Sequence, residues 1–116
     1  MAEATKQLVT GKCHCGAINF QSTGPIFRQG VCDCHACQKA TGTLGSPNVG
    51  VKPETFKIIK GIPAQYKAES NDGCEAGTWN FCANCGAPLF WKAPDGAEIA
   101  IFAGALDNTS LFIKKN

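Results

Sequence analysis

Eight cysteines carry most of the chemistry that this sequence can offer, and seven of them stand in closely spaced groups. They are Cys13, Cys15, Cys32, Cys34, Cys37, Cys74, Cys82 and Cys85. The spacings C-x-C, C-x-C-x-x-C and C-x-x-C are typical of metal-ligand clusters. Disulfide frameworks usually spread their cysteines and belong to secreted proteins, whereas residues 1–11 lack the basic-then-apolar pattern of a signal peptide. The sequence therefore favours metal binding over disulfides.

The first and last groups share a feature, since a glycine follows each of them. In C-x-C on an extended strand both thiols face the same side. The glycine permits a turn with positive φ, which lets backbone N–H groups approach the sulfur atoms. Four thiolates satisfy a tetrahedral Zn²⁺ completely. The sequence thus predicts a closed, structural zinc site made by Cys13, Cys15, Cys82 and Cys85.

A redox pair is the alternative for Cys82 and Cys85. Redox C-x-x-C motifs of the thioredoxin type open a helix. Here Gly86 and Pro88 follow at once and discourage a helix. The metal interpretation is therefore preferred.

The middle group, Cys32, Cys34 and Cys37, has no glycine behind it. Residues 38–40 are good helix formers, and this short helix should end near Thr41 and Gly42. Cys37 would then lie at a helix N-terminus, where the helix dipole favours a thiolate. Three protein ligands with an exchangeable fourth position are how catalytic zinc is usually held. An open, catalytic zinc site is the preferred interpretation.

A second closed site is the alternative for this group, with Cys74, His35 or His14 as the fourth ligand. His35 lies inside the group, but its short connection to Cys34 makes joint binding awkward. His14 would point away from Cys13 and Cys15 on a strand. A zinc or redox sensor built on the three cysteines is a further, weaker hypothesis.

The elements that must position these groups read as short β-strands, at about residues 17–20, 56–59, 65–68, 78–81, 89–91 and 98–102. Turn signals separate them, and no long helical periodicity appears. We expect a mainly β protein of roughly eight short strands with one short helix after Cys37. Trp79 and Trp91 flank the second glycine-tailed pair and should be ordinary core residues, or shield the closed site.

The chain has 116 residues and should form one domain. Residues 1–10 are expected to be a tail or edge strand, 11–110 a single zinc-binding β domain, and 111–116 a C-terminal tail. The chain has eleven basic and nine acidic residues, and the basic ones do not cluster, so no nucleic acid partner is expected. Arg28, Lys39 and Lys52 are expected to be solvated charges. No apolar stretch is long enough to cross a bilayer, and a cytoplasmic location is expected.

Segments 11–18, 32–37 and 81–86, with their cysteines in this order and spacing, resemble the glutathione-dependent formaldehyde-activating enzyme family, which includes the centromere protein V group. The resemblance covers about residues 11–107, and segment 51–61 is similar to the middle of the family.

The resemblance implies an Mss4-like (β-tent) fold of small antiparallel sheets and two zinc ions per chain. Partial occupancy of the second zinc site is expected, because a three-thiolate site exposed at a pocket binds its metal more weakly. It implies structural zinc at the four-cysteine group and a catalytic zinc at Cys32, Cys34 and Cys37, near a bound thiol. The implied activity is that of a carbon–sulfur lyase, the condensation of formaldehyde with glutathione to S-(hydroxymethyl)glutathione. The alternative is a non-catalytic, zinc-stabilised binding module.

Overall fold

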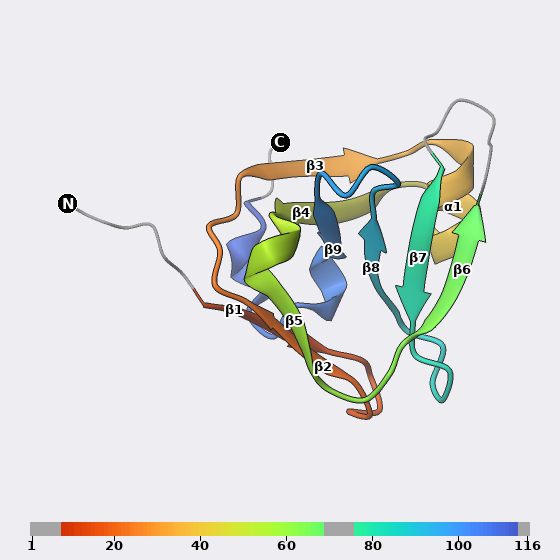
Figure 1. The fold of residues 1–116 in the computed structure, drawn as a ribbon. Helices are drawn as coiled ribbons and strands as arrows, with labels where there is room; N and C mark the ends of the chain where they lie inside the picture. The colour runs from red at the N-terminus through yellow and green to blue at the C-terminus, as the bar shows by residue number, and fades with distance from the viewer. Residues whose placement is uncertain (1–7, 69–75, 114–116) are drawn as a thin grey trace.

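Nine strands, one short α-helix and three 3₁₀ turns make up the part of the chain that the computed structural model describes, residues 8–68 and 76–113 (Figure 1). The strands form two antiparallel sheets. The small sheet has the order β1 (Val9–Lys12), β2 (Asn19–Ser22), β5 (Phe56–Lys60). The large sheet has the order β3 (Arg28–Cys32), β4 (Ser46–Val51), β9 (Ile99–Phe102), β8 (Pro88–Lys92), β7 (Gly77–Phe81), β6 (Ala64–Ala68). The predicted mainly β class is confirmed.

The remaining elements are short. Helix α1 (His35–Thr41) follows β3, and the 3₁₀ turns are η1 (Pro53–Thr55), η2 (Ala103–Ala105) and η3 (Thr109–Leu111). Cys37 lies in the first turn of α1, as predicted, and Gly42 ends the helix with φ 75°. Glycine adopts this left-handed conformation without the steric cost that other residues meet. Within the described residues, no helix has the length and apolar character needed to span a bilayer.

The six predicted strands are present with shifts of one or two residues, but β3 and β4 were not predicted from the sequence. Strand β3 carries Arg28 and Gly30, and β4 carries Pro47 and Gly50. These residues obscure the apolar alternation by which a half-buried strand is recognised. The mixed composition of β3 and β4 has a structural reason, because one face of these strands lines a cavity and not the core.

The core lies between the two sheets. Val49 of β4, Ile101 of β9 and Phe90 of β8 stand in register across the large sheet and share its inner face. Phe90 meets Phe56 of the small sheet at 4.7 Å between ring centroids, and Phe56 meets Phe20 at 5.5 Å. Since Phe20 and Phe56 belong to β2 and β5, this aromatic cluster joins the sheets and contributes much of the buried apolar area.

Strand β1 connects to the region after β9 by polar contacts. The Asp107 backbone N–H donates to the carbonyl of Thr10 at 2.9 Å, and its carboxylate accepts from Thr10 Oγ1 and Lys12 Nζ, each at 2.9 Å. The hydrogen bond from Lys12 holds the pKa of the Asp107 carboxyl below its ordinary value. Both side chains are exposed, so the ion pair itself adds little stability. Val9, at the start of β1, is fully buried in the core.

Replacing Phe20 with alanine tests the role of the aromatic cluster. Phe20 is 1% exposed, and its removal should lower the free energy of unfolding by about 3–5 kcal/mol, because it leaves a cavity between the sheets. Denaturant unfolding with the metal kept in excess measures the change. Ile62→Ala is the control, since Ile62 is 89% exposed and should change stability by less than about 0.5 kcal/mol. Equal effects of the two substitutions would contradict this account.

Candidate metal centres and an adjoining cavity

The structure brings together the four cysteines of the glycine-tailed pairs. The sulfur atoms of Cys13, Cys15, Cys82 and Cys85 all lie within 4.8 Å of one another. The Sγ–Sγ distances are 3.7 Å for Cys13–Cys15 and 3.7 Å for Cys15–Cys82. In a tetrahedron with Zn–S bonds of about 2.3 Å, the sulfur atoms would stand about 3.8 Å apart. The cluster therefore has the dimensions of a four-thiolate metal site.

The predicted glycine turns shape both halves of this cluster. Gly16 has φ 83° and Gly86 has φ 79°. In each turn the glycine N–H donates to the carbonyl of the pair's first cysteine, at 3.2 Å for Cys13 and 2.7 Å for Cys82. These tight turns reverse the chain directly after the ligands. They hold the sulfur atoms of each pair on the same side of the backbone.

Backbone N–H groups also point at the sulfur atoms. Ile18 N donates to Cys13 Sγ at 3.3 Å, while Asn84 N and Cys85 N donate to Cys82 Sγ at 3.3 and 3.4 Å. Hydrogen bonds of this kind stabilise a thiolate more than a thiol, because the thiolate carries the negative charge that the N–H dipole attracts. The cluster is thus prepared to hold anionic sulfur, as a metal requires.

The pKa values of the thiols follow their hydrogen bonds. The Asn84 side-chain amide, which donates to Cys15 Sγ at 3.2 Å, lowers the pKa of Cys15. The backbone N–H of Ala87 lowers the pKa of Cys85 in the same way. The pKa of Cys82 is raised, since burial and its neighbouring thiols outweigh the lowering effect of the backbone N–H of Cys85. A bound cation would lower the pKa of Cys82 again, because its positive charge balances the negative charge of the thiolates.

The three cysteines of the middle group also converge. Cys32 ends β3, Cys34 is the N-cap of α1 and Cys37 lies in its first turn, and their sulfur atoms lie within 4.8 Å of one another. The Sγ–Sγ distances, 3.4 Å for Cys32–Cys34 and 2.7 Å for Cys32–Cys37, are shorter than in the first cluster. A metal ion here would have to spread the sulfur atoms apart. Cys32 and Cys37 are free thiols on one side of the group, and Cys34 could add a third ligand once it is reduced.

Burial raises the pKa of the Cys37 thiol to about 12, and the adjacent Cys32 thiol adds to the rise. The Ser46 side chain acts in the opposite direction on Cys37 and also donates from Oγ to the Cys32 carbonyl at 3.3 Å. Metal coordination reverses such a rise, because a coordinated thiol loses its proton outright. The group therefore favours either neutral thiols or a bound cation.

The candidates for a fourth ligand do not join this group among the described residues. His35 and His14 are both exposed, and neither is part of a cluster that could hold a metal. Cys74 lies outside the described residues. Among the described residues, six cysteines are free thiols, which a metal site needs. Cys34 is disulfide-bonded, so it can offer a thiolate to a metal only after reduction.

A cavity of about 340 Å³ opens beside the second cluster, on the face of the large sheet opposite the core. Cys32, Cys37, Arg28, Trp79 and Trp91 are among the residues that line it. Another cavity, of about 410 Å³, adjoins the first cluster at Lys12 and His14. None of the four cysteines of that cluster lines either of these two cavities. The second cluster is therefore the one that faces a space for a ligand.

The two tryptophans do not lie at the four-cysteine cluster, which the sequence had left open as one of their possible positions. Trp79 and Trp91 pair across β7 and β8 with their rings 6.4 Å apart, and both line the cavity at the second cluster. They do not shield the first cluster. An added Cβ at Gly77 would collide with the Trp91 indole, so Gly77 leaves the space in which that ring lies. Both indole N–H groups are buried and have no hydrogen-bond partner in the part of the chain that the structure describes.

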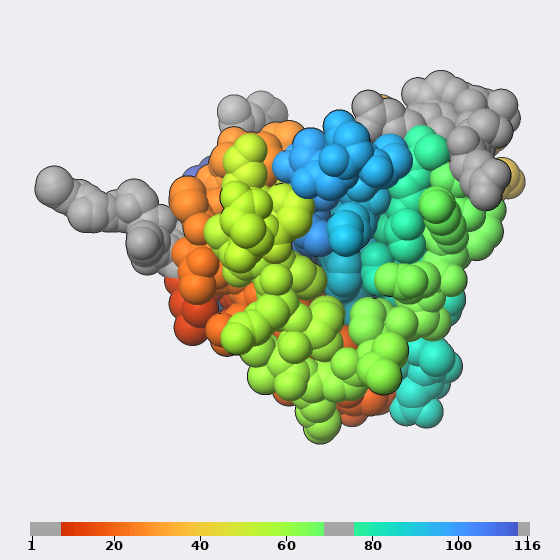
Figure 2. All heavy atoms as spheres, viewed as in Figure 1, coloured from red at the N-terminus to blue at the C-terminus, as the bar shows by residue number. Residues whose placement is uncertain are grey.

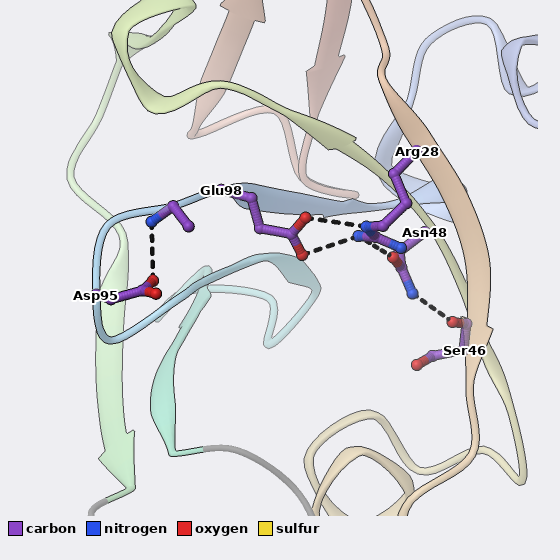
Figure 3. A network of polar contacts seen from close by, with 6 residues as sticks. Arg28, Ser46, Asn48, Asp95 and Glu98 are labelled. Carbon is purple, nitrogen blue, oxygen red and sulfur yellow. Dashed lines mark hydrogen bonds and ion pairs between the residues drawn. The ribbon is translucent and has the colours of Figure 1, made fainter.

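Arg28 also differs from the expectation of a solvated charge. Its Nε donates to Glu98 Oε1 at 2.9 Å and its Nη2 to Glu98 Oε2 at 3.0 Å, and Nη2 also donates to Asn48 Oδ1 at 2.8 Å (Figure 3). Asn48 in turn donates to the carbonyl of Ser46 at 3.0 Å. A polar network thus leads along β4 from the ion pair towards Cys32, whose carbonyl accepts from Ser46.

Sequence reasoning could have linked Arg28 to the second cluster. Arg28, Gly30 and Cys32 alternate along β3, so their side chains share one face of the strand. The signal was missed because this stretch was not recognised as a strand. Glu98 and the tryptophans had no such signal, since only strand pairing brings them to the same cavity.

Cysteine substitutions distinguish the two clusters. Cys82→Ser should remove one metal ion per chain and lower the free energy of unfolding by more than about 3 kcal/mol, because this buried ligand joins distant segments. Cys37→Ser should remove one metal ion at a cost of less than about 1 kcal/mol, because no residue of α1 is fully buried. Elemental analysis and denaturant unfolding, with a phosphine reductant present, measure both quantities. His35→Ala is the control that should change neither. Equal destabilisation by the two cysteine substitutions would mean that both clusters hold the fold together.

Comparison with known proteins agrees with this architecture. Residues 8–115 match the family described as "Glutathione-dependent formaldehyde-activating enzyme". A Halomonas elongata protein named "Putative glutathione-dependent formaldehyde-activating enzyme" is 30% identical over 106 residues, covering 87% of this chain and 67% of that protein. The crystal structure of a Rhodobacter sphaeroides protein superposes with a TM-score of 0.68 at 18% identity, over 85% of this chain and 88% of that one. That likeness concerns the fold, which is of the predicted Mss4-like class. The chain belongs to the glutathione-dependent formaldehyde-activating enzyme family.

Proposed function

We propose that this protein is a zinc-dependent carbon–sulfur lyase that acts on glutathione or a related thiol adduct, for example in the condensation of formaldehyde with glutathione to S-(hydroxymethyl)glutathione. The observation that carries the proposal is that Cys32 and Cys37 line a cavity of about 340 Å³. Membership of the family supports the substrate class. Zinc is the metal that all-cysteine sites of these dimensions typically hold.

The two clusters have different roles in this proposal. Cys13, Cys15, Cys82 and Cys85 hold a structural zinc ion, and Cys32, Cys37 and the reduced Cys34 hold the catalytic one. When bound at the second cluster, zinc supplies a position at which a substrate thiol is held as the thiolate. Three cysteine thiolates leave such a site net anionic and therefore weak in polarising a carbonyl. Thiolate capture and positioning are favoured over activation of the aldehyde.

The residues of the cavity contribute orientation and exclusion of water. Trp79 is 5% exposed and, with Trp91, forms an apolar wall beside the thiols. A thiolate held against an apolar wall is less solvated than in water, which favours its attack on a carbonyl carbon. Arg28 and Asn48 provide polar groups at the other end of the cavity. A reducing, cytoplasmic location is part of the proposal, because Cys34 has to be reduced before it can bind zinc.

The test is the rate at which formaldehyde and glutathione exchange with their adduct. This addition proceeds without a catalyst, so exchange between the methylene signals has to be measured by NMR against buffer and against zinc-free protein. Zinc-loaded protein should accelerate it, and Cys37→Ser should reduce the acceleration by about 100-fold or more, because it removes a ligand of the proposed zinc. His35→Gln is the matched control and should keep full activity, since His35 is exposed and outside the cluster. Exchange no faster than in buffer would refute the lyase proposal and favour a non-catalytic, zinc-stabilised binding module.

A further inference from the structure

We propose that the cavity beside the second cluster accepts a thiol whose neighbouring group is uncharged, such as an amide, and that Glu98 sets this selectivity by neutralising Arg28. This inference rests on the proposed function and narrows its substrate class. A thiol flanked by amides, as in a peptide, would be accepted. A thiol with a carboxylate close by would be disfavoured.

The floor of the cavity follows from the strand register. Arg28 pairs with Gly50, Gly50 with Ala100, Ala100 with Trp91, and Trp91 with Trp79. These residues form one row across five strands of the large sheet, on the face opposite the core. The Arg28–Glu98 pair lies over Gly50, and the small side chain of Ala100 leaves a trough between this pair and the aromatic rings. The trough is therefore long enough for several heavy atoms, far more than formaldehyde alone.

The second cluster stands beside this row. Cys32 shares a face of β3 with Arg28 and lies four residues further along, which is about 13 Å between Cα atoms. Gly30 lies between them on the same face, and it lines the cavity with both. A ligand whose sulfur meets the cysteines would thus extend its other end towards the guanidinium.

The charge at that end of the trough is already compensated. The two hydrogen bonds between Arg28 and Glu98 form a bidentate pair, and the two side chains are only 34% and 19% exposed. Glu98 follows the turn between β8 and β9, a turn that stands at the surface in Figure 2. Bidentate pairs at partly buried positions are among the stronger ion pairs. A ligand carboxylate would have to displace Glu98 and leave it without its partner, which costs more than the new contact returns.

The hydrogen-bonding capacity that remains is suited to a neutral oxygen atom. Arg28 Nη1 makes no hydrogen bond within the described part of the chain, while both oxygen atoms of Glu98 and the oxygen of Asn48 are in use. An added Cβ at Gly30 would lie 3.3 Å from Nη1, so the absence of a side chain there keeps this edge open to the trough. An amide or aldehyde oxygen can accept from Nη1 without disturbing the ion pair.

The test compares two thiols of equal length that differ in charge, 3-mercaptopropionamide and 3-mercaptopropionate. Zinc-loaded protein in a phosphine reductant is titrated with each, and tryptophan fluorescence is recorded. The chain has two tryptophans, and both line the cavity, so the signal reports on the site directly. The wild-type protein should bind the amide about tenfold more tightly than the carboxylate, as expected for a compensated cation beside an anionic cluster.

Glu98→Gln should shift this ratio of affinities by about tenfold towards the carboxylate, because it keeps the shape of the contact but leaves the charge of Arg28 uncompensated. Intrinsic differences between the two thiols cancel in this comparison of ratios. Asp95→Asn is the matched control, since Asp95 belongs to the same turn but accepts from Ala97 N at 2.9 Å and does not contact Arg28 (Figure 3). It should leave the ratio unchanged. Arg28→Gln is a second variant, which should shift the ratio further towards the amide.

The outcomes separate the two proposals. A wild-type preference for the carboxylate, or a ratio that neither Glu98→Gln nor Arg28→Gln changes, would overturn the selectivity inference and leave the lyase proposal standing. An equal shift in Asp95→Asn would attribute the effect to overall charge and would also overturn it. If the zinc-loaded protein bound neither thiol, the thiol-binding site itself would be refuted, and both proposals would fall.

Discussion

Four sulfur atoms from two segments far apart in the chain meet in one cluster, and the arrangement of the two sheets depends on it. Cys13 and Cys15 follow β1, whereas Cys82 and Cys85 lie between β7 and β8, in the other sheet. Cys13 and Cys82 are themselves part of the hydrophobic core. A domain of this size buries a limited apolar area, so a metal crosslink at the junction of its sheets would supply stability that packing alone provides sparingly. The sheets can then meet over a small aromatic cluster.

The two faces of the large sheet lie in different environments. The face that carries Val49, Ile101 and Phe90 packs on the small sheet, and the opposite face carries the row from Arg28 to Trp79. Because side chains alternate along a strand, the same residues that build the core also determine which neighbours point into the cavity. Ala100 in the middle of the outer row leaves open space that a larger side chain would close, and Gly50 leaves the space that Arg28 and Glu98 fill. Cavity and core are consequently linked through register, and a slip of one residue would exchange them.

Charge is distributed unevenly over this cavity. The cysteine cluster at one end favours a cation, and the guanidinium at the other end is matched by its own carboxylate, so neither end presents a free positive charge to a ligand. The walls between them are largely aromatic and aliphatic. Such a site can hold a thiol by its sulfur while discriminating through the uncharged part of the molecule. The sulfur atom of the thiol is thus bound at one place, and the rest of the thiol is selected at another. This arrangement suits a reaction in which the other substrate, formaldehyde, is too small to be recognised by shape.

The sequence by itself determined the chemistry: the grouping of the cysteines, the glycine turns behind two of the groups, the helix that begins at the third, and the mainly β class. These are local features, set by spacing over a few residues and by the conformations that glycine and good helix formers prefer. Only the tertiary structure decided that Trp79, Trp91 and Glu98 lie beside Cys32, because strand order and register bring them there from distant positions. The same holds for Arg28, which the sequence presents as one more surface charge and the folded chain pairs with Glu98, seventy residues away. Local spacing cannot encode such contacts, since they depend on which strands pair and on which face of the sheet each residue then occupies.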